Sequence, residues 1–189
     1  MTLLLARHGE CTASGTYCGR TDAPLTEKGR QQAAALAQVL APYPISACFT
    51  SPLLRALETA RVALDGRDVP LSIDQRLREV DFGAWEGLKY AEIEQSWPKL
   101  IPAWLADPSG VDIPEGEPFS SLRRRVRAFL SEHAQSALSD NILIVAHGGP
   151  LAVIGLELLN RPGTDFFNHV PSLGSLRLVD VERREVLPC

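Results

Sequence analysis

The stretch Thr2-Leu3-Leu4-Leu5-Ala6-Arg7-His8-Gly9 decides the fold of this chain. Its first five residues are an apolar run that predicts a short buried strand, and a polar turn that contains glycine begins where the run ends. Ligands bind at the carboxyl ends of strands in α/β proteins. In that position His8, beside the always-charged guanidinium of Arg7, suits a nucleophile that faces a phosphoryl group.

The same pattern returns late in the chain. Leu143-Ile144-Val145-Ala146 is a second continuous apolar run, and His147-Gly148-Gly149 follows it. Either histidine alone could be an unrelated turn residue. Because both follow a buried strand, we expect the two imidazoles to lie side by side at one edge of the sheet.

Expected strands and helices alternate along the chain. Apolar runs predict strands over residues 2–6, 45–49, 69–73, 141–146, 175–181 and 185–187. Spacing and capping residues predict helices over 26–41 with Thr26 as the cap, from Ser51-Pro52 onward with the serine as the cap, over 119–138 and over 150–159. This alternation indicates a three-layer α/β/α sandwich with a mostly parallel central sheet.

Size and composition favour one domain over residues 1–189. The net charge of −4 argues against general nucleic-acid binding, which needs a basic face. No apolar stretch approaches the roughly 20 residues that span a bilayer, and the first run is too short for a signal peptide. Cys11, Cys18, Cys48 and Cys189 show no CxxC spacing, so we expect neither a metal site nor disulfides, and a cytoplasmic location.

Arg55 follows the strand predicted over 45–49, in the first turn of the next helix. A helix N-terminus favours anions, and an arginine there could clamp a phosphate through two hydrogen bonds. The alternative is a surface arginine, or one that pairs with Glu58 or Glu79.

Glu79 lies in the segment Leu77-Arg78-Glu79-Val80-Asp81-Phe82-Gly83-Ala84-Trp85-Glu86-Gly87. A carboxylic acid near apolar and aromatic residues could protonate a leaving oxygen. Asp81 and Glu86 compete for that role, and spacing does not separate the three.

Segments along essentially the whole chain resemble the histidine phosphatase superfamily, which has the phosphoglycerate-mutase-like fold. The matching segments are 4–10, 19–29, 51–55 with Thr59-Ala60, Glu79 with 82–87, 114–117 and 147–149. This resemblance implies that His8, Glu79 and His147 are the catalytic residues.

The resemblance also implies a role for each residue. His8 would be the nucleophile and form a phosphohistidine, and Glu79 would be the general acid and then the base that activates water. The phosphoryl oxygens would be held by Arg7, Arg55 and His147, with Ser14 and Gly148 as further phosphate-binding residues. The cations would keep His8 unprotonated near neutral pH. No metal and no cofactor is needed.

The loop after His8 departs from the family pattern, because Cys11 and Ser14 stand where the family often has Thr and Asn. The Asn is a phosphate ligand, so the hydroxyl of Ser14 or Thr12 could replace it. We expect Cys11 and Cys18 to fill space. The run 123–125 is expected on a solvated helix face, and His169 in the core or on the surface unless the last crossover brings it to the site.

Mutases of this family carry a longer, basic, proline-rich segment after Trp-Glu-Gly. The corresponding segment, residues 88–107, is short here and has Lys89 and Lys99 as its only cations, which favours a phosphatase. The loop 17–22 and the compact length resemble the α-ribazole phosphatases, so the expected reaction removes phosphate from α-ribazole 5'-phosphate in cobalamin biosynthesis. A phosphoglycerate mutase or sugar-phosphate phosphatase, or a non-catalytic phosphate-binding module, remain the alternatives. The expected partner is a small phosphorylated substrate, without nucleic acid or membrane, and the oligomeric state stays open.

Overall fold

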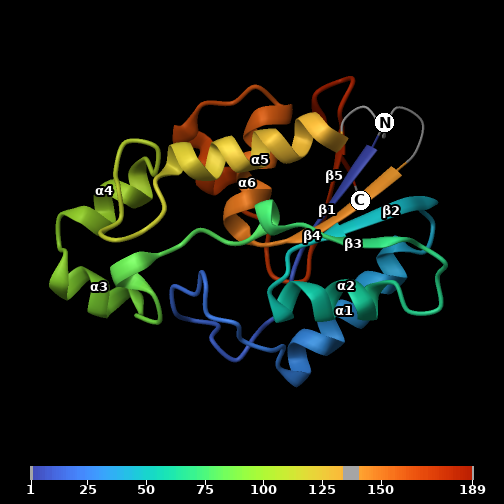
Figure 1. The fold of residues 1–189 in the computed structure, drawn as a ribbon, viewed down its shortest axis with the longest axis horizontal. Helices are drawn as coiled ribbons and strands as arrows, with labels where there is room; N and C mark the ends of the chain where they lie inside the picture. The colour runs from blue at the N-terminus through green and yellow to red at the C-terminus, as the bar shows by residue number, and fades with distance from the viewer. Residues whose placement is uncertain (1, 134–140, 189) are drawn as a thin grey trace.

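A six-stranded, mostly parallel sheet forms the centre of the fold in the computed structural model, which describes residues 2–133 and 141–188. The strand order is β3-β2-β4-β1-β5-β6 (Figure 1). The strands are β1 (Thr2–Arg7), β2 (Ile45–Thr50), β3 (Leu71–Ile73), β4 (Asn141–Ala146), β5 (Leu176–Asp180) and β6 (Glu185–Leu187). The first four pair in parallel, whereas β5 and β6 pair antiparallel at one side. The predicted fold class is confirmed.

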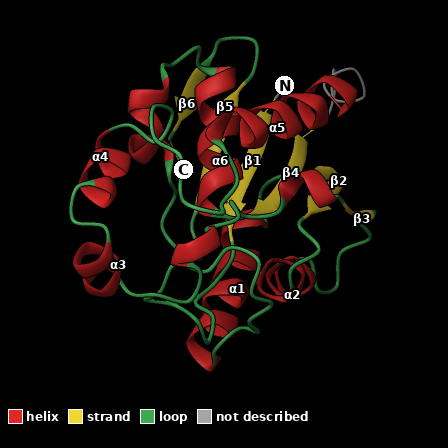
Figure 2. Cartoon of the chain, turned by 60° about the vertical axis from the view of Figure 1, so that its left-hand side comes forward, coloured by secondary structure: helices red, strands yellow, loops and turns green. Residues whose placement is uncertain are grey.

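Helices cover both faces of the sheet (Figures 1 and 2). The helices α1 (Glu27–Leu40) and α2 (Leu54–Ala63) lie on one face, and α5 (Phe119–His133) and α6 (Gly148–Leu158) lie on the other. Successive strand residues point to opposite faces, so Leu4 and Val145 join the apolar cluster of α1 and α2, while Leu5 and Ile144 join that of α5 and α6. The central strands are apolar throughout because both of their faces are covered.

The two central strands end together. Arg7 of β1 is in register with Ala146 of β4, and the N–H of His8 donates to the carbonyl of Ala146 at 3.0 Å. His8 and His147 therefore leave the sheet from neighbouring strands, as their sequence context predicts.

The caps of the first two helices have different origins. The hydroxyl of Thr26 accepts the N–H of Gly29 at 3.0 Å, which confirms the predicted cap of α1. The predicted serine cap of α2 is wrong, because this helix begins at Leu54 and Ser51 lies before it. The N–H of Leu54 instead donates to the carboxylate of Asp22 at 2.7 Å. A loop distant in sequence thus takes the role expected of a local side chain.

Other boundaries shift by a few residues. The helix α6 begins at Gly148 rather than at Pro150, and β3 covers only the last part of the run 69–73. The helix α5 ends at His133, and its predicted continuation to Leu138 lies outside the described residues. Among the helices that the structure describes, none is both long and apolar enough to cross a membrane.

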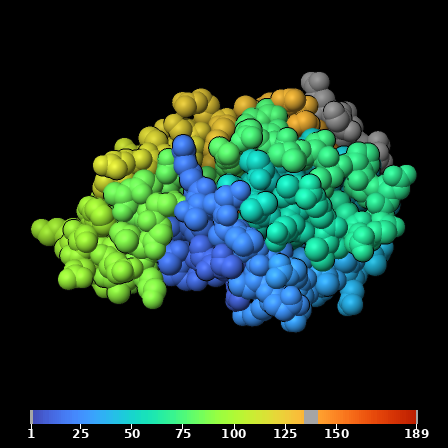
Figure 3. Space-filling model, turned by 60° about the horizontal axis from the view of Figure 1, so that its bottom comes forward, coloured from blue at the N-terminus to red at the C-terminus, as the bar shows by residue number. Residues whose placement is uncertain are grey.

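The irregular middle segment forms a lobe of short helices at the left of Figure 1, with α3 (Tyr90–Ser96) and α4 (Leu100–Ala106). Aromatic packing holds the lobe together, since the rings of Trp85 and Trp104 meet edge to face with centroids 5.5 Å apart. Figure 3 shows the loop after β1, in blue, between this lobe, in green, and the region of α2, in teal. The lobe and this loop form the walls of the site.

Candidate active site

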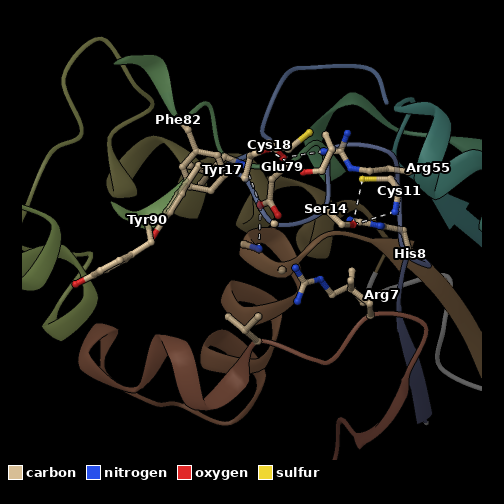
Figure 4. A pocket seen from close by; sticks show the side chains of 18 of the residues that line it. Arg7, His8, Cys11, Ser14, Tyr17, Cys18, Arg55, Glu79, Phe82 and Tyr90 are labelled. Carbon is tan, nitrogen blue, oxygen red and sulfur yellow. Dashed lines mark hydrogen bonds between the residues drawn. The ribbon is translucent and has the colours of Figure 1, made fainter. Parts of the chain in front are cut away.

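The strand ends open into a cavity of about 320 Å³. The predicted site residues that line it are Arg7, His8, Ser14, Arg55, Glu79 and Gly148. Figure 4 shows Arg7, His8 and Arg55 toward one end of the cavity and Glu79 near its middle. The fold therefore brings side chains from β1, α2 and the segment before the lobe into one site.

The rings of His8 and His147 lie against each other, with centroids 5.0 Å apart and planes at 59°. This confirms the expected pairing at the sheet edge. His8 is 5% exposed and lines the cavity, whereas His147 is completely buried and is not among the lining residues. The two histidines therefore occupy different positions, one facing the cavity and one beside it in the interior.

A backbone carbonyl determines the tautomer of His8. The ring Nδ1 lies 2.7 Å from the carbonyl oxygen of Gly9, and a carbonyl can only accept, so Nδ1 carries the proton. Nε2 keeps its lone pair and is free to attack an electrophile. A side chain at position 9 would meet the carbonyl oxygen of Gly29 at 2.4 Å, so only glycine permits this close turn.

Burial keeps both histidines neutral. The pKa of His8 is lowered to about 3, mainly by loss of hydration; the hydrogen bond to Gly9 opposes this shift, and the charges of Arg55 and Arg7 add to it. Burial also lowers the pKa of His147, with the neighbouring His8 as the next cause. From the sequence we expected the nearby cations to keep His8 unprotonated, whereas desolvation is the larger cause of its lowered pKa.

The lowered pKa of His8 predicts that acid destabilises the fold. Between the unfolded value of 6.5 and the folded value of about 3, the unfolded chain binds a proton on His8 that the folded chain excludes. The free energy of unfolding should therefore fall as pH falls below 6.5, by at most about 1.4 kcal/mol per pH unit from this group. Urea unfolding between about pH 7 and about pH 4.5 measures the loss. It should be smaller in His8→Asn, and equal losses in both proteins would contradict a neutral His8.

Ser51, predicted only as a helix cap, is a site residue that the sequence did not indicate. Its Oγ lies 2.7 Å from Nε2 of His147, and both side chains are fully buried. A serine hydroxyl can donate its proton to Nε2 while its oxygen accepts the N–H of Leu53 at 3.3 Å. The ring proton of neutral His147 then lies on Nδ1, which has no partner among the described residues. Ser51 thereby orients His147.

The Ser51→Ala variant should lower kcat roughly 10- to 100-fold with little change in KM, because His147 loses the group that sets its tautomer and orientation. Steady-state kinetics on an aryl phosphate measure this split, and ¹⁵N NMR of the histidine ring reports the tautomer. Ser46→Ala, at an exposed position of β2, is the matched control. An unchanged kcat in Ser51→Ala would contradict the orienting role.

Arg55 is buried rather than on the surface, with 1% of its area exposed. Its Nη1 donates to the carbonyl of Thr21 at 2.7 Å and its Nη2 to that of Gly19 at 3.0 Å. Glu58, one of its alternative partners, accepts the N–H of Leu25 instead. Carbonyl dipoles hold the guanidinium in place without neutralising its charge, which favours an anion in the cavity.

A backbone carbonyl also holds the guanidinium of Arg7. Its Nη1 donates to the carbonyl of Pro171 at 2.8 Å, and its Nε is buried without a partner among the described residues. Burial lowers its pKa, and the charge of Glu79 opposes that shift. An anion that accepts from this guanidinium would offset the cost of its burial.

The structure separates the three candidate carboxylates. Glu86 accepts the N–H of Gly19 at 3.0 Å and the N–H of Thr21 at 2.9 Å, so it holds the loop whose carbonyls bind Arg55. Asp81 forms an ion pair with Arg20 at 2.8 Å. Of the three, only Glu79 lines the cavity that contains His8.

Backbone donors bind one oxygen of Glu79. Its Oε1 accepts the N–H groups of Val80 and Gly149, each at 2.9 Å. A side chain at position 149 would lie 2.4 Å from Oε1, so glycine is required for this approach. Oε2 receives neither bond and is the oxygen left to exchange a proton with a substrate.

Arg125 is a second residue whose role the sequence did not indicate. It pairs with Glu117 through two hydrogen bonds, at 2.8 and 2.9 Å, and donates to the carbonyl of Glu79 at 3.1 Å. The prediction of a solvated face over 123–125 is wrong for Arg125, because α5 packs against the segment that carries Glu79. The salt bridge with Glu117 thus holds Arg125 in place, and Arg125 in turn fixes the backbone at Glu79.

The loop after His8 brings two thiols to the cavity. Ser14 Oγ accepts the N–H of Cys11 at 3.0 Å and donates to Cys11 Sγ at 3.6 Å, so this hydroxyl shapes the loop. Hydrogen bonding with Cys18 lowers the pKa of the Cys11 thiol to about 5 and raises the pKa of Cys18. Both thiols line the cavity.

The last two candidates lie on or near α6. Gly148, in its first turn, lines the cavity where a helix N-terminus favours an anion. His169 is not a lining residue, and its ring packs against Gly155, where an added side chain would lie 2.9 Å from Nδ1. The expectation of a structural His169 is confirmed. Within residues 2–133 and 141–188, no group of three or more His, Cys, Asp or Glu is placed to hold a metal ion.

The fold and the cavity together define a class of enzyme. A neutral histidine with a free Nε2 stands at the carboxyl end of a parallel sheet, with two guanidinium groups and one carboxylate around the same cavity. Phosphoryl transfer depends mainly on positioning and on stabilising negative charge, and this arrangement can supply both around a neutral histidine.

The chain belongs to the histidine phosphatase superfamily (branch 1), whose family model matches residues 3–187. The adenosylcobalamin/alpha-ribazole phosphatase of Salmonella typhimurium is 36% identical over 183 residues, covering 96% of this chain and 91% of that protein. Phosphoserine phosphatase 1 of Hydrogenobacter thermophilus is 28% identical over 184 residues, covering 96% and 87%. The crystal structure of an alpha-ribazole-5'-P phosphatase from Escherichia coli superposes with a TM-score of 0.87 at 30% identity, covering 99% and 93%. The predicted family is confirmed.

Proposed function

We propose that this chain is a phosphomonoesterase that hydrolyses α-ribazole 5'-phosphate through a phosphohistidine on His8. One observation carries the reaction: the free Nε2 of a buried, neutral His8 faces a cavity that also holds Arg7, Arg55 and Glu79. The similarity to alpha-ribazole phosphatases over nearly the whole chain supports the substrate.

Charge balance supports a phosphate at this end of the cavity. The guanidinium groups of Arg7 and Arg55 lie here beside two neutral histidines, and a bound phosphate would pair with both of them. The phosphoryl oxygens would accept from Arg7, from Arg55 and from the N-terminal turn of α6 at Gly148. Ser14 is a phosphate ligand only if its hydroxyl turns away from Cys11.

In the first step, Nε2 of His8 attacks phosphorus, and the bond between phosphorus and the ester oxygen breaks. Glu79 donates its proton to that oxygen through Oε2, so the alcohol leaves uncharged. Nδ1 of His147 has no partner among the described residues and lies in the interior beside His8, so a small shift of this ring on substrate binding would let Nδ1 donate to a phosphoryl oxygen and offset the charge that develops.

In the second step, the Glu79 carboxylate accepts a proton from water as the water attacks the phosphohistidine. The bond between phosphorus and Nε2 breaks, inorganic phosphate leaves, and the protonated Glu79 is ready for the next cycle. The residues of this chain supply the nucleophile, the acid and the positive charges, and each proton has a defined donor and acceptor.

A mutase needs a second anion-binding site, because its substrate carries a carboxylate or another phosphate besides the phosphoryl group that is transferred. Among the residues that line the cavity, Arg7 and Arg55 are the cations, and both lie at the phosphate end. This distribution of positive charge favours hydrolysis of a phosphate monoester over transfer of the phosphoryl group between two acidic molecules.

A substrate panel with purified protein tests the proposal. The expected kcat/KM for α-ribazole 5'-phosphate is at least about tenfold above that for phosphoserine, 3-phosphoglycerate and fructose 1,6-bisphosphate, a difference of about 1.4 kcal/mol in transition-state binding. The His8→Ala protein, prepared in parallel, measures contaminating phosphatase. Faster hydrolysis of any other member, or transfer to 3-phosphoglycerate without phosphate release, would contradict the assignment.

A further inference from the structure

Beyond Glu79 the cavity continues into a wall of aromatic side chains. These are Tyr17, Phe82, Tyr90, Trp104, Phe166 and Phe167, which we call the aromatic wall. Figure 4 shows Tyr17, Phe82 and Tyr90 on the opposite side of Glu79 from Arg7, His8 and Arg55. Because Glu79 would protonate the ester oxygen, the wall lies on the side where the alcohol half of the substrate must sit.

The rings of the wall support one another. Tyr17 meets Phe82 at a right angle with centroids 5.2 Å apart, and Trp104 meets Phe167 at 77° and 5.2 Å. Edge-to-face contacts of this kind hold ring orientations in place. The wall is therefore a pre-arranged surface, assembled from the loop after β1, the lobe and the Gly163–His169 turn.

Part of the wall remains uncovered. Tyr90 is 42% exposed and Phe167 is 36% exposed, although both belong to a cavity whose other large rings are mostly buried. Large rings left open at the rim of a cavity indicate a surface for an apolar ligand group. The hydroxyl of Tyr90 donates to Glu94 at 2.9 Å, which holds this ring at the rim.

The charges exclude acidic alcohols from the same place. The guanidinium groups of Arg7 and Arg55 both lie at the phosphate end, and the aromatic wall contributes rings without a cation. The carboxylate of phosphoserine or phosphoglycerate would find no positive partner there, and burying an unpaired charge is costly. An uncharged, flat group would instead stack on the exposed rings.

We propose that Tyr17, Tyr90 and Phe167 form a subsite for an uncharged heteroaromatic ring carried by the alcohol half of the substrate. The proposal rests on the proposed function, because it takes the phosphate to lie against His8. It goes further by making the ring, rather than the sugar, the feature that selects the substrate. The benzimidazole of α-ribazole 5'-phosphate has this chemistry.

The test compares substrates that differ in the ring alone. α-Ribazole 5'-phosphate and adenosine 5'-monophosphate carry a ring on the sugar, whereas ribose 5-phosphate carries none. The wild type should hydrolyse at least one ring-bearing substrate with a kcat/KM at least about tenfold above that of ribose 5-phosphate. Tyr90→Leu and Phe167→Leu should each remove roughly tenfold of that advantage while leaving ribose 5-phosphate within about twofold of wild type.

Two control variants distinguish the loss of ring stacking from general damage to the protein. Tyr90→Phe keeps the ring and loses the hydroxyl, so it should retain most of the preference. Tyr43→Leu removes a half-buried tyrosine from the cluster of α1 and α2 and should leave both substrates unaffected. Competitive inhibition by the neutral nucleoside α-ribazole gives a readout without turnover, and Tyr90→Leu should weaken it roughly tenfold.

The outcomes distinguish this proposal from the proposed function. Equal losses on ring-bearing and ring-free substrates, or a wild type that treats them alike, would overturn the subsite even if α-ribazole 5'-phosphate is hydrolysed. A ring preference that the leucine variants remove supports the subsite. If adenosine 5'-monophosphate is then the better substrate, the subsite still stands and the proposed substrate is wrong.

Discussion

Replacing His8 with alanine should lower kcat/KM for an aryl phosphate by at least about 10⁴-fold, because the variant loses the atom that we propose as the nucleophile. His147 cannot take its place, since its ring is fully buried and its Nε2 is hydrogen-bonded to Ser51. The measurement is steady-state hydrolysis of p-nitrophenyl phosphate by the variant and the wild type. The circular dichroism spectrum and urea midpoint of both proteins show whether the variant folds.

Trapping the intermediate makes the His8 prediction specific. An alkaline quench of wild type with ³²P-labelled substrate should leave label on the protein as alkali-stable phosphohistidine, and His8→Ala should leave none. His133→Ala, at the end of α5 and not among the residues that line the cavity, controls for loss of a histidine and should be labelled normally. Retained turnover or label in His8→Ala would rule out His8 as the nucleophile.

Replacing Glu79 with glutamine should lower turnover in proportion to how poor the leaving group is. Glutamine keeps an oxygen for the N–H groups of Val80 and Gly149, so the site geometry is preserved while the exchangeable proton is lost. An alkyl phosphate needs protonation of its leaving oxygen and should lose roughly 10²- to 10⁴-fold in kcat. The leaving group of p-nitrophenyl phosphate is a stable phenolate that needs no proton. The rate of the first step with this substrate should therefore fall much less.

A plot of log kcat/KM against leaving-group pKa measures this difference, since kcat/KM reports the first irreversible step. The slope should be steeper in Glu79→Gln than in wild type. Asp81→Asn is the matched control, because Asp81 is the neighbouring carboxylate and pairs with Arg20 outside the His8 cavity. The same loss across all leaving groups, or a steeper slope in Asp81→Asn, would contradict proton donation by Glu79.

The sheet and the two strand-end histidines follow from local sequence. The strands β1 and β4 are covered on both faces, so every residue between Leu3 and Ala6 and between Ile142 and Ala146 is buried and apolar. Such runs are visible without any knowledge of the partner strand. The cap of α1 at Thr26 is likewise local, because the threonine hydroxyl and the N–H of Gly29 that donates to it lie within one turn.

Other features depend on contacts between distant residues, which local patterns do not encode. Ser51 has the chemistry of a helix cap, yet its hydroxyl binds His147, and Asp22 receives the N–H of Leu54 in its place. Arg125 looks like part of a solvated face, yet α5 places it against the carbonyl of Glu79. Each error arises because a polar or charged side chain can bind either a local or a distant partner, and only packing selects between them.

The sequence by itself determined the layered α/β fold, the strand-end positions of His8 and His147, and the family of the chain, because hydrophobic periodicity and short motifs are local properties. Spacing did not separate Glu79 from Asp81 and Glu86, and only the family resemblance indicated Glu79; the tertiary structure shows that Glu79 is the one that reaches the cavity, and that burial more than charge keeps His8 neutral. It also decided that aromatic side chains from distant segments line the same cavity. Burial, tautomers and pKa values depend on everything within a few ångströms of an atom, and the fold assembles those neighbours from segments far apart in the chain.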